Sequence, residues 1–327
     1  MTRRLQAIVW GLGVLTAPMA WSQSAAKSWS APRTVDGQPD LQGIWSTATV
    51  TPLERPRALG DKQFFTPQEA LDFEKKVLET ANRDRRDGGV EADVARAYNE
   101  AWFDRGTKVV PSLRTSLIVD PPSGRIPALT PAAQKMEALR AERLRRSPNG
   151  PEDRLLRERC ILGENMGPPM LPTIYNNNFQ IFQNAGTVAI FSEMIHDFRM
   201  VPINGGPHLP PGVRQWLGDA RGHWEGSTLV VDTTNFTAQN PIHGSDENMH
   251  LVERFKRVRP DMILYRFTVE DPTAFTQPWS AEVPLTSAKG PIYEYACHEG
   301  NYGMAGLLSG ARAEEKKAVE AATKGSK

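Results

Sequence analysis

The chain has 327 residues, of which 39 are basic and 38 are acidic, and its formal net charge is +1. This balance argues against a dedicated nucleic-acid-binding protein, which would carry a basic stripe. Two cysteines are too few for a disulfide-dense scaffold or a four-cysteine zinc site, whereas a chain of this length can bury a substantial core.

The N-terminus predicts an export signal. Arg3 and Arg4 precede an apolar run over residues 7–20, and a small-x-small cleavage motif follows directly before Gln23. The apolar run is shorter than the roughly 20 residues that span a bilayer, so a signal peptide over residues 1–22 is favoured over a membrane anchor. We therefore expect a periplasmic or secreted protein that has no membrane span once the signal is removed.

Residues 23–160 are expected to form an extended and helical region that packs on the remainder of the chain. Thr66 and Glu69 form a capping box with a proline at the first helical position, which predicts a helix that ends near the following Gly-Gly break. The other elements expected here are a helix over about 91–104, a hairpin around the turn at 121–124 and a helix over about 131–146.

From Asn176 the pattern changes to short runs with strand-like alternation, separated by turn-forming residues. The joins are too short for crossover helices, so we predict an antiparallel meander, closed as a lipocalin-like or similar β-barrel or folded as a sandwich. The barrel domain is placed at 161–302 and a C-terminal helix at 303–327, which gives an α+β fold with a mainly β core. Candidate strands cover 178–183, 187–193, 197–203, 223–225, 228–235, 250–258, 262–271, 278–286 and 291–298.

Cys160 and Cys297 are expected to form a disulfide, because cysteines in an exported domain are usually paired. The bridge would tie the start of the barrel domain to its last predicted strand. The alternative is a reactive thiol, but neither cysteine lies in a recognisable nucleophile motif.

All six histidines lie between residues 196 and 298, which points to the β region as the place for proton transfer. Strand alternation puts Asp197 and Arg199 on one face and His196, together with apolar residues, on the other. A carboxylate and a guanidinium beside a histidine suit a site that orients a base or binds an anion. The alternative is an exposed ion pair opposite a core face.

Four further residues of the β region are candidates for acid–base chemistry. His208 lies in a rigid Gly/Pro loop, where functional groups are often held, although a turn role is the alternative. Asp232 would point into a barrel. Glu253 interrupts an apolar face, where a carboxylate either pairs with an arginine or titrates high enough to act as an acid or base. His298 follows Cys297, so the disulfide would fix its position.

Aromatic residues are frequent in the β region, and most are expected in its core. A barrel lined partly by aromatic side chains and a few carboxylates would suit a small apolar substrate, such as an aromatic or terpenoid compound. The residues expected to bind it are Trp216, Trp224, Tyr265, Trp279, Glu294 and Tyr295.

Neither a metal nor an organic cofactor is expected. The sequence has no HxH, HExxH or CxxC motif, and the spacing of His243 and His250 is a weak basis for a metal site. A GxSxG elbow, a dinucleotide-binding GxGxxG and a P-loop are also absent, so serine-hydrolase, nicotinamide and nucleoside-triphosphate chemistry lack support.

Four segments carry a resemblance to a family. They are Arg114–Pro122, Trp224–Phe236, Phe267–Pro272 and Tyr295–Tyr302. Together they resemble a family of exported bacterial proteins of uncharacterised function, and the resemblance spans nearly all of the mature chain. It implies a shared fold and export, and no catalytic residue carries over from it.

The favoured hypothesis is an exported enzyme without a cofactor: a lyase, isomerase or hydrolase that transfers protons on a small apolar molecule. A histidine, His196 or His208, would act as the base, a carboxylate would orient it, and Arg199 would hold developing negative charge. The alternatives are a lipocalin-like carrier of hydrophobic ligands and a metal-dependent hydrolase. The catalytic residues expected are His196, Asp197, Arg199, His208, Asp232, Glu253 and His298.

Overall fold

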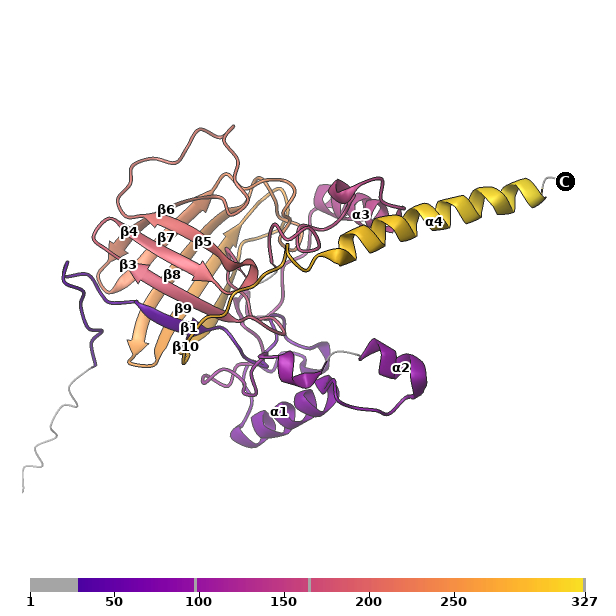
Figure 1. The fold of residues 1–327 in the computed structure, drawn as a ribbon. Coiled ribbons are helices and arrows are strands. Elements are labelled where there is room, and N and C mark those ends of the chain that lie inside the picture. The colour runs from indigo at the N-terminus through magenta and orange to yellow at the C-terminus, as the bar shows by residue number, and fades with distance from the viewer. Residues whose placement is uncertain (1–28, 97–98, 164–165, 326–327) are drawn as a thin grey trace, which may run out of the picture.

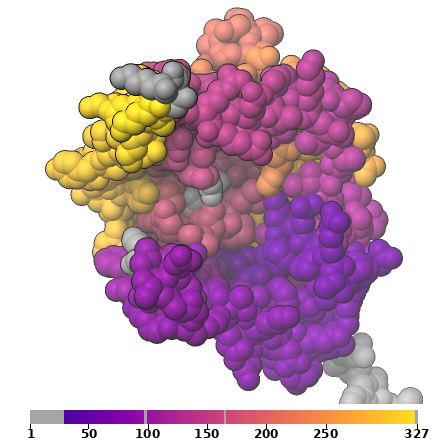
Figure 2. Space-filling model, turned by 90° about the vertical axis from the view of Figure 1, so that its right-hand side faces the viewer, coloured from indigo at the N-terminus to yellow at the C-terminus, as the bar shows by residue number. Residues whose placement is uncertain are grey.

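The structure is a computed structural model that describes residues 29–96, 99–163 and 166–325. The predicted signal peptide therefore lies outside the described residues. Figure 1 shows a β-barrel with the helices gathered at one side and α4 extending away from it. Figure 2 shows that this side is hollowed between the violet N-terminal segments and the magenta segments above them. Within the described ranges, no helix combines the length and apolarity needed to cross a membrane.

In the described residues ten strands form one sheet that closes almost completely into an antiparallel barrel, as predicted. Their order is β5-β4-β3-β1-β10-β9-β8-β7-β6, and β2 pairs with β10 beside this path. The two ends meet where Ile203 bridges Gly222, and the Asn204 N–H donates to the Gly222 carbonyl at 2.8 Å. The strands are β1 Gly43–Ser46, β2 Ile118–Asp120, β3 Asn178–Gln183, β4 Thr187–Ser192, β5 Asp197–Pro202, β6 Asp219–Glu225, β7 Thr228–Thr234, β8 His250–Arg259, β9 Met262–Glu270 and β10 Trp279–Ser287.

The limits of the sheet differ from the prediction at both ends. β1 lies between β3 and β10, and β2 pairs with β10 instead of forming a local hairpin, so the sheet extends beyond the boundary predicted at residue 160. The strand predicted over 291–298 is wrong, because that segment makes no sheet pairing. β1, β2 and β9 already pair with β10, so its edges are occupied by other strands.

The described helices begin largely where capping predicts. At α1 the Thr66 hydroxyl accepts from the Glu69 N–H at 3.3 Å, and the Glu69 carboxylate accepts from the Thr66 N–H at 2.8 Å. The helix predicted over 91–104 is wrong in length, because α2 is short and the exposure of Val90 and Val94 leaves it little packing. The helices are α1 Pro67–Ala81, α2 Gly89–Ala95, α3 Pro131–Arg145 and α4 Tyr302–Gly325, with 3-10 helices η1 Arg57–Leu59, η2 Glu100–Trp102, η3 Pro151–Asp153 and η4 Met194–His196.

The interior of the barrel is a packed core. Alternate residues of β7, β8 and β9 face inward, so that Val231, Glu253 and Phe267 lie side by side in one row of the register. All three are fully buried. Burial of large apolar side chains contributes about 1.5–3 kcal/mol each, so this interior dominates the stability of the fold. The largest buried aromatic side chains are Trp45, Phe179, Phe236, Phe255, Tyr265, Phe267 and Trp279.

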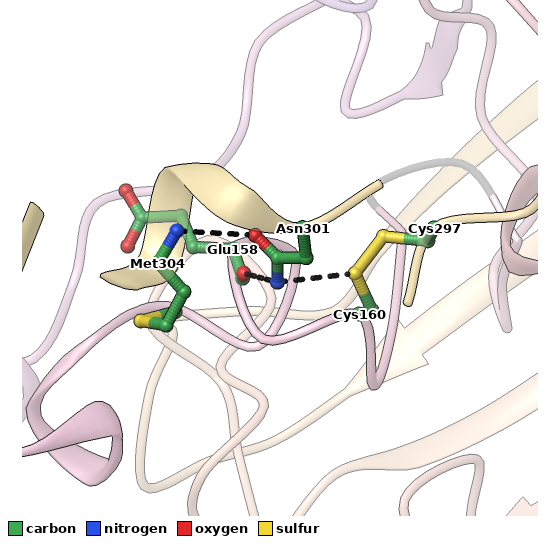
Figure 3. The surroundings of a disulfide bond; sticks show 5 residues. All are labelled: Glu158, Cys160, Cys297, Asn301 and Met304. Carbon is green, nitrogen blue, oxygen red and sulfur yellow. Dashed lines mark hydrogen bonds between the residues drawn. A yellow bond between two sulfur atoms is a disulfide. The ribbon is translucent and has the colours of Figure 1, made fainter. Parts of the chain in front are cut away.

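The predicted disulfide between Cys160 and Cys297 is present, across 137 positions of the sequence. Figure 3 shows that Asn301 reinforces it: the side-chain amide donates to the Glu158 carbonyl at 2.9 Å, and the side-chain oxygen accepts from the Met304 N–H at 3.2 Å. The bridge and Asn301 together fasten the start of α4 to the turn that contains Glu158 and Cys160.

Candidate functional site

A cleft of about 750 Å³ opens at the end of the barrel where β7 ends and β10 begins, on the hollowed side in Figure 2. Its lining comes from segments far apart in the sequence, including the residues that follow β1, those that precede β3 and the β7–β8 connection. We call it the mouth cleft. Its volume suits a small organic ligand, since such sites occupy about 300–1,000 Å³.

Apolar side chains form most of the lining of the mouth cleft. Leucine, isoleucine and valine side chains are joined there by the prolines Pro52, Pro168, Pro169, Pro172 and Pro241. None of the described lining residues is acidic, whereas two are arginines, Arg105 and Arg157. Arg105 is bound to the Glu100 carboxylate at 2.9 Å. Among the described residues the lining of the cleft is therefore mainly apolar and carries no carboxylate.

His243 is the one histidine in the described lining of the mouth cleft, and a tight turn presents it. Ile242 and Ser245 exchange two backbone hydrogen bonds, of 2.7 and 3.0 Å, around His243 and Gly244. These two central residues have φ values of 53° and 101°, as a type I′ turn requires. The Ser245 hydroxyl donates to Asp271 at 2.6 Å, which anchors the turn in the core. The position of the imidazole is thus fixed by the turn.

The surroundings of His243 favour the neutral form of its imidazole. Its ring packs edge-on to the buried Trp279, with ring centroids 6.2 Å apart, while the side chain stays accessible to solvent from the cleft. The surrounding protein removes water from the ring and lowers the pKa of His243, which outweighs the opposing effect of Glu54 and Glu137. No ring nitrogen bonds to a described residue. A neutral imidazole offers a ligand one N–H donor and one acceptor nitrogen.

His243 was not among the catalytic residues expected from the sequence. Its local signal is the His-Gly dipeptide between Ile242 and Ser245, which resembles the Asn-Gly pair of type I′ turns. That signal predicts a turn, whereas the cleft around the turn depends on segments that only the fold brings together.

Inside the barrel, Glu253 pairs with an arginine, which is one of the two outcomes expected for a carboxylate on an apolar face. The Arg199 guanidinium donates to both Glu253 oxygens, at 3.0 Å to Oε1, and the Tyr265 hydroxyl donates to Oε1 at 2.7 Å. The Met170 N–H in turn donates to the tyrosine oxygen at 3.1 Å. Burial first, and the nearby Glu253 charge second, raise the pKa of Tyr265. Arg199, Glu253 and Tyr265 are all at most 5% exposed, which makes this a structural network closed to solvent.

Along β5 the side chains alternate as predicted, and the face that carries Arg199 points into the barrel. Backbone turns with positive φ at Ile195 and His196 interrupt the alternation before β5 begins. Arg199 points inward to its carboxylate partner, whereas Phe198 and Met200, on the apolar face that the alternative interpretation placed in the core, are 49% and 57% exposed. The buried ion pair therefore decides which face of β5 points into the barrel.

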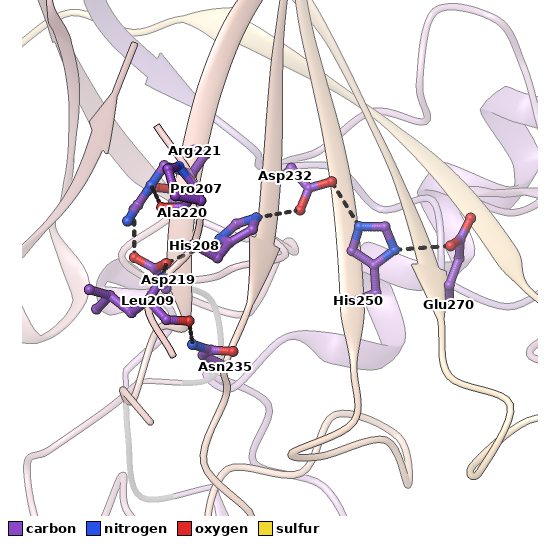
Figure 4. A network of polar contacts seen from close by, with 10 residues as sticks. All are labelled: Pro207, His208, Leu209, Asp219, Ala220, Arg221, Asp232, Asn235, His250 and Glu270. Carbon is purple, nitrogen blue, oxygen red and sulfur yellow. Dashed lines mark hydrogen bonds and ion pairs between the residues drawn. The ribbon is translucent and has the colours of Figure 1, made fainter. Parts of the chain in front are cut away.

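Asp232 points outward, contrary to the prediction, because Leu229, Val231 and Thr233 take the inner face of β7. Figure 4 shows it between two histidines on the outer wall. Its carboxylate contacts His208 Nε2 at 2.9 Å and His250 Nε2 at 2.8 Å.

The contacts of Asp232 belong to a chain of charged groups across β6, β7, β8 and β9. His208 Nδ1 contacts Asp219 at 3.1 Å and His250 Nδ1 contacts Glu270 at 3.0 Å, so both nitrogens of each ring face carboxylates. The hydrogen bond to Asp232, followed by that to Glu270, raises the pKa of His250 to about 9, and the same contact lowers the pKa of Asp232. Neither ring therefore offers a free nitrogen to a substrate.

Five other predicted site residues line a second hollow, of about 370 Å³, beside the disulfide. Four of them are exposed, so solvent screens their charges. The five are His196, Asp197, Glu294, Tyr295 and His298. The structure thus brings these residues together, but away from the residues predicted to act with them, Arg199, His208, Asp232 and Glu253.

The aromatic residues that were predicted to bind a substrate pack against other parts of the protein. Tyr265 and Trp279 are buried in the barrel, and Trp224 packs against the same core. Trp216 and Tyr295 pack in a smaller cluster around Met194. None of these residues is in the described lining of the mouth cleft, although Trp279 contacts His243 and Trp216 accepts a hydrogen bond from Asn240, both of which line it.

No protein-family model, no curated protein and no solved structure matches this chain. The resemblance to a family of exported bacterial proteins therefore stays a prediction from its motifs. In the part of the chain that the structure describes, no group of three His, Cys, Asp or Glu side chains could hold a metal ion. The mouth cleft and His243 are accordingly the basis for a functional proposal.

Proposed function

We propose that the protein binds a small, largely apolar organic molecule in the mouth cleft. The observation that carries this proposal is the cleft itself, about 750 Å³ of mainly apolar lining at the end of a barrel whose interior is packed. Apolar surface gains about 25 cal/mol per Å² on leaving water, so such a lining favours an apolar ligand. The ligand would lie at the mouth, unlike a lipocalin ligand, which lies inside its barrel.

Titration with the neutral fluorescent probe N-phenyl-1-naphthylamine tests this proposal, and saturable one-site binding is expected. Ile174 lines the cleft and is 46% exposed, so Ile174→Trp fills the cleft without replacing a core residue. We expect it to weaken probe affinity by about tenfold, or about 1.4 kcal/mol. Leu139→Trp, at a half-exposed position of α3 outside the cleft, is the matched control. Equal affinities in the two variants, or no saturable binding, would contradict the proposal.

A second candidate function is proton transfer on the bound molecule without a cofactor, as in a lyase, isomerase or hydrolase. The specific observation in its favour is His243, a neutral and accessible imidazole that a tight turn holds against the apolar cleft. A positioned general base of this kind accelerates a reaction by about 10²–10⁴-fold. The base would then be His243 instead of His196 or His208.

Turnover of a panel of aromatic, terpenoid and glycosidic compounds, with and without a chelator, tests this second candidate. His243→Asn should lower the rate by about 10²–10⁴-fold, because asparagine keeps the turn and removes the imidazole. His196→Ala and His208→Ala are the controls and should retain activity. If His196→Ala lost activity while His243→Asn kept it, the base would lie in the second hollow. If the chelator abolished turnover, a metal-dependent hydrolase would be favoured.

We also propose that the protein is exported to the periplasm or secreted. The Cys160–Cys297 disulfide supports this location, because such bonds persist in oxidising compartments. Cell fractionation followed by N-terminal mass analysis tests it, and a mature chain that starts at Gln23 is the expected result. Recovery of the full-length chain in the cytoplasm would contradict the proposal.

A further inference from the structure

A second cavity of about 450 Å³ adjoins the mouth cleft. The two share four lining residues, Leu155, Leu156, Gln239 and Pro241, so that one ridge separates them. Four arginines, Arg140, Arg143, Arg154 and Arg159, and two acidic residues, Glu152 and Asp153, also line the second cavity, which we call the arginine hollow. A ligand that lies across the ridge would therefore meet a mainly apolar surface on one side, and on the other a surface where arginines outnumber acidic residues by four to two.

Three of the four guanidinium groups in the arginine hollow already have carboxylate partners. Arg140 pairs with Glu137 and Asp246, Arg143 with Asp153, and Arg154 with Glu158. Arg159 differs, because its guanidinium forms no hydrogen bond or ion pair with any residue in the described ranges.

The backbone on both sides of Arg159 is fastened. Glu158, before it, accepts a hydrogen bond from Asn301, and Cys160, after it, forms the disulfide (Figure 3). The Arg159 N–H itself donates to the Leu155 carbonyl at 3.2 Å. A guanidinium on such a turn loses little backbone freedom when it binds a ligand, which favours affinity.

We propose that the ligand of the mouth cleft is amphipathic: its apolar body occupies the cleft and an oxyanion, such as a carboxylate or sulfonate, binds the Arg159 guanidinium in the arginine hollow. This inference rests on the function proposed for the cleft. The planar guanidinium donates two parallel N–H bonds that match the two oxygens of such a group. None of the described residues that line the mouth cleft is acidic, and in the arginine hollow the Asp153 carboxylate is already paired with Arg143.

A matched pair of fluorescent probes tests the inference. Anilinonaphthalene-8-sulfonate carries a sulfonate that N-phenyl-1-naphthylamine lacks, and the two share the same aromatic body. We expect the wild-type protein to bind the anionic probe about five- to tenfold more tightly, as a partly exposed charge-assisted hydrogen bond provides. Arg159→Gln should abolish this preference and leave the affinity for the neutral probe unchanged. Arg159→Lys keeps the positive charge but lacks the two parallel N–H donors of the guanidinium, so it should retain part of the preference for the anionic probe.

Arg145→Gln provides the control for net charge, because Arg145 lies on the same helix as Arg140 and Arg143 but does not line the hollow. The preference of the Arg145→Gln variant for the anionic probe should equal that of the wild type. Equal affinities of the wild type for both probes, or equal losses in Arg159→Gln and Arg145→Gln, would overturn the role of Arg159 while neutral-probe binding still supports the cleft. If the neutral probe itself failed to bind, the proposed function would fail first.

Discussion

The titratable side chains of the barrel that we singled out are all paired, whereas two at the mouth have no polar partner in the described ranges. In the barrel wall and interior, Glu253 is bound by Arg199, and Asp232 is bound by two histidines. At the mouth, the side chains of His243 and Arg159 have no hydrogen-bond or ion-pair partner among the described residues, although both line cavities. Paired groups hold a fold together, whereas unpaired groups beside a cavity are available to a ligand. The two regions should therefore respond differently to substitution.

Histidine makes the contrast clear. His243 and His250 are seven positions apart, yet burial lowers the pKa of His243 while two carboxylates raise the pKa of His250 to about 9. The first is neutral near pH 7 and the second is charged. Their environments, rather than their residue type, decide which of them can exchange a proton with a ligand.

The largest effect is expected inside the barrel. Glu253→Gln would leave the buried Arg199 guanidinium without a counter-charge and should lower the free energy of unfolding by about 3–5 kcal/mol in urea denaturation. The double variant Arg199→Met/Glu253→Leu removes both charges and should recover most of that loss. A loss below about 1 kcal/mol in the single variant would show that the pair does not hold the core.

Removal of the disulfide should cause the second-largest loss of stability, and it should also change ligand binding at the mouth. Replacement of Cys160 and Cys297 by serine is expected to lower the free energy of unfolding by about 2–4 kcal/mol, because the unfolded chain gains freedom. The same variant frees the backbone beside Arg159, so its preference for the anionic probe should fall while neutral-probe affinity stays constant. An undiminished preference would mean that the disulfide does not position Arg159.

His250 on the outer wall should make a smaller contribution to the free energy of unfolding, and this contribution should depend on pH. Because folding raises the pKa of His250, its contribution to stability is complete below its unfolded pKa of about 6.5 and is lost as pH rises through about 9. We expect about 1 kcal/mol, since the imidazole is 37% exposed and solvent screens the contacts. Urea unfolding of His250→Gln should lack this slope between pH 6.5 and 9, whereas the control His223→Gln should keep it. If both variants showed the same change of unfolding free energy with pH, a titratable group other than His250 would be responsible for it.

The barrel was predictable because its signals are local. Strand alternation and short joins from Asn176 onward predict an antiparallel meander, and the capping box at Thr66 predicts the start of α1. Alternation shows that two faces of a strand differ, but it does not show which face points inward when both carry polar and apolar residues. In β5 that choice depends on Glu253, 54 positions from Arg199, and no local pattern contains that partner.

The mouth cleft was not predictable for a related reason. Its lining combines segments between Thr49 and His243 that meet only after the barrel has closed. The sequence does indicate a turn at His243, and it does pair Cys160 with Cys297. It does not indicate that the turn faces the mouth cleft. It also does not indicate that the disulfide holds Arg159 at the edge of the arginine hollow.

The smallest effect on stability is expected at His243, where the effect on a ligand should be largest. Asparagine is favoured in type I′ turns, so His243→Asn should change the free energy of unfolding by less than about 0.5 kcal/mol at pH 7. Below pH 6.5 the unfolded wild-type chain gains a proton that the folded protein resists, because folding lowers the pKa of His243. Wild-type stability should therefore fall slightly relative to the variant as the pH decreases, in paired urea titrations. A large loss at pH 7 would make His243 a structural residue and would remove the basis for placing a base at the mouth.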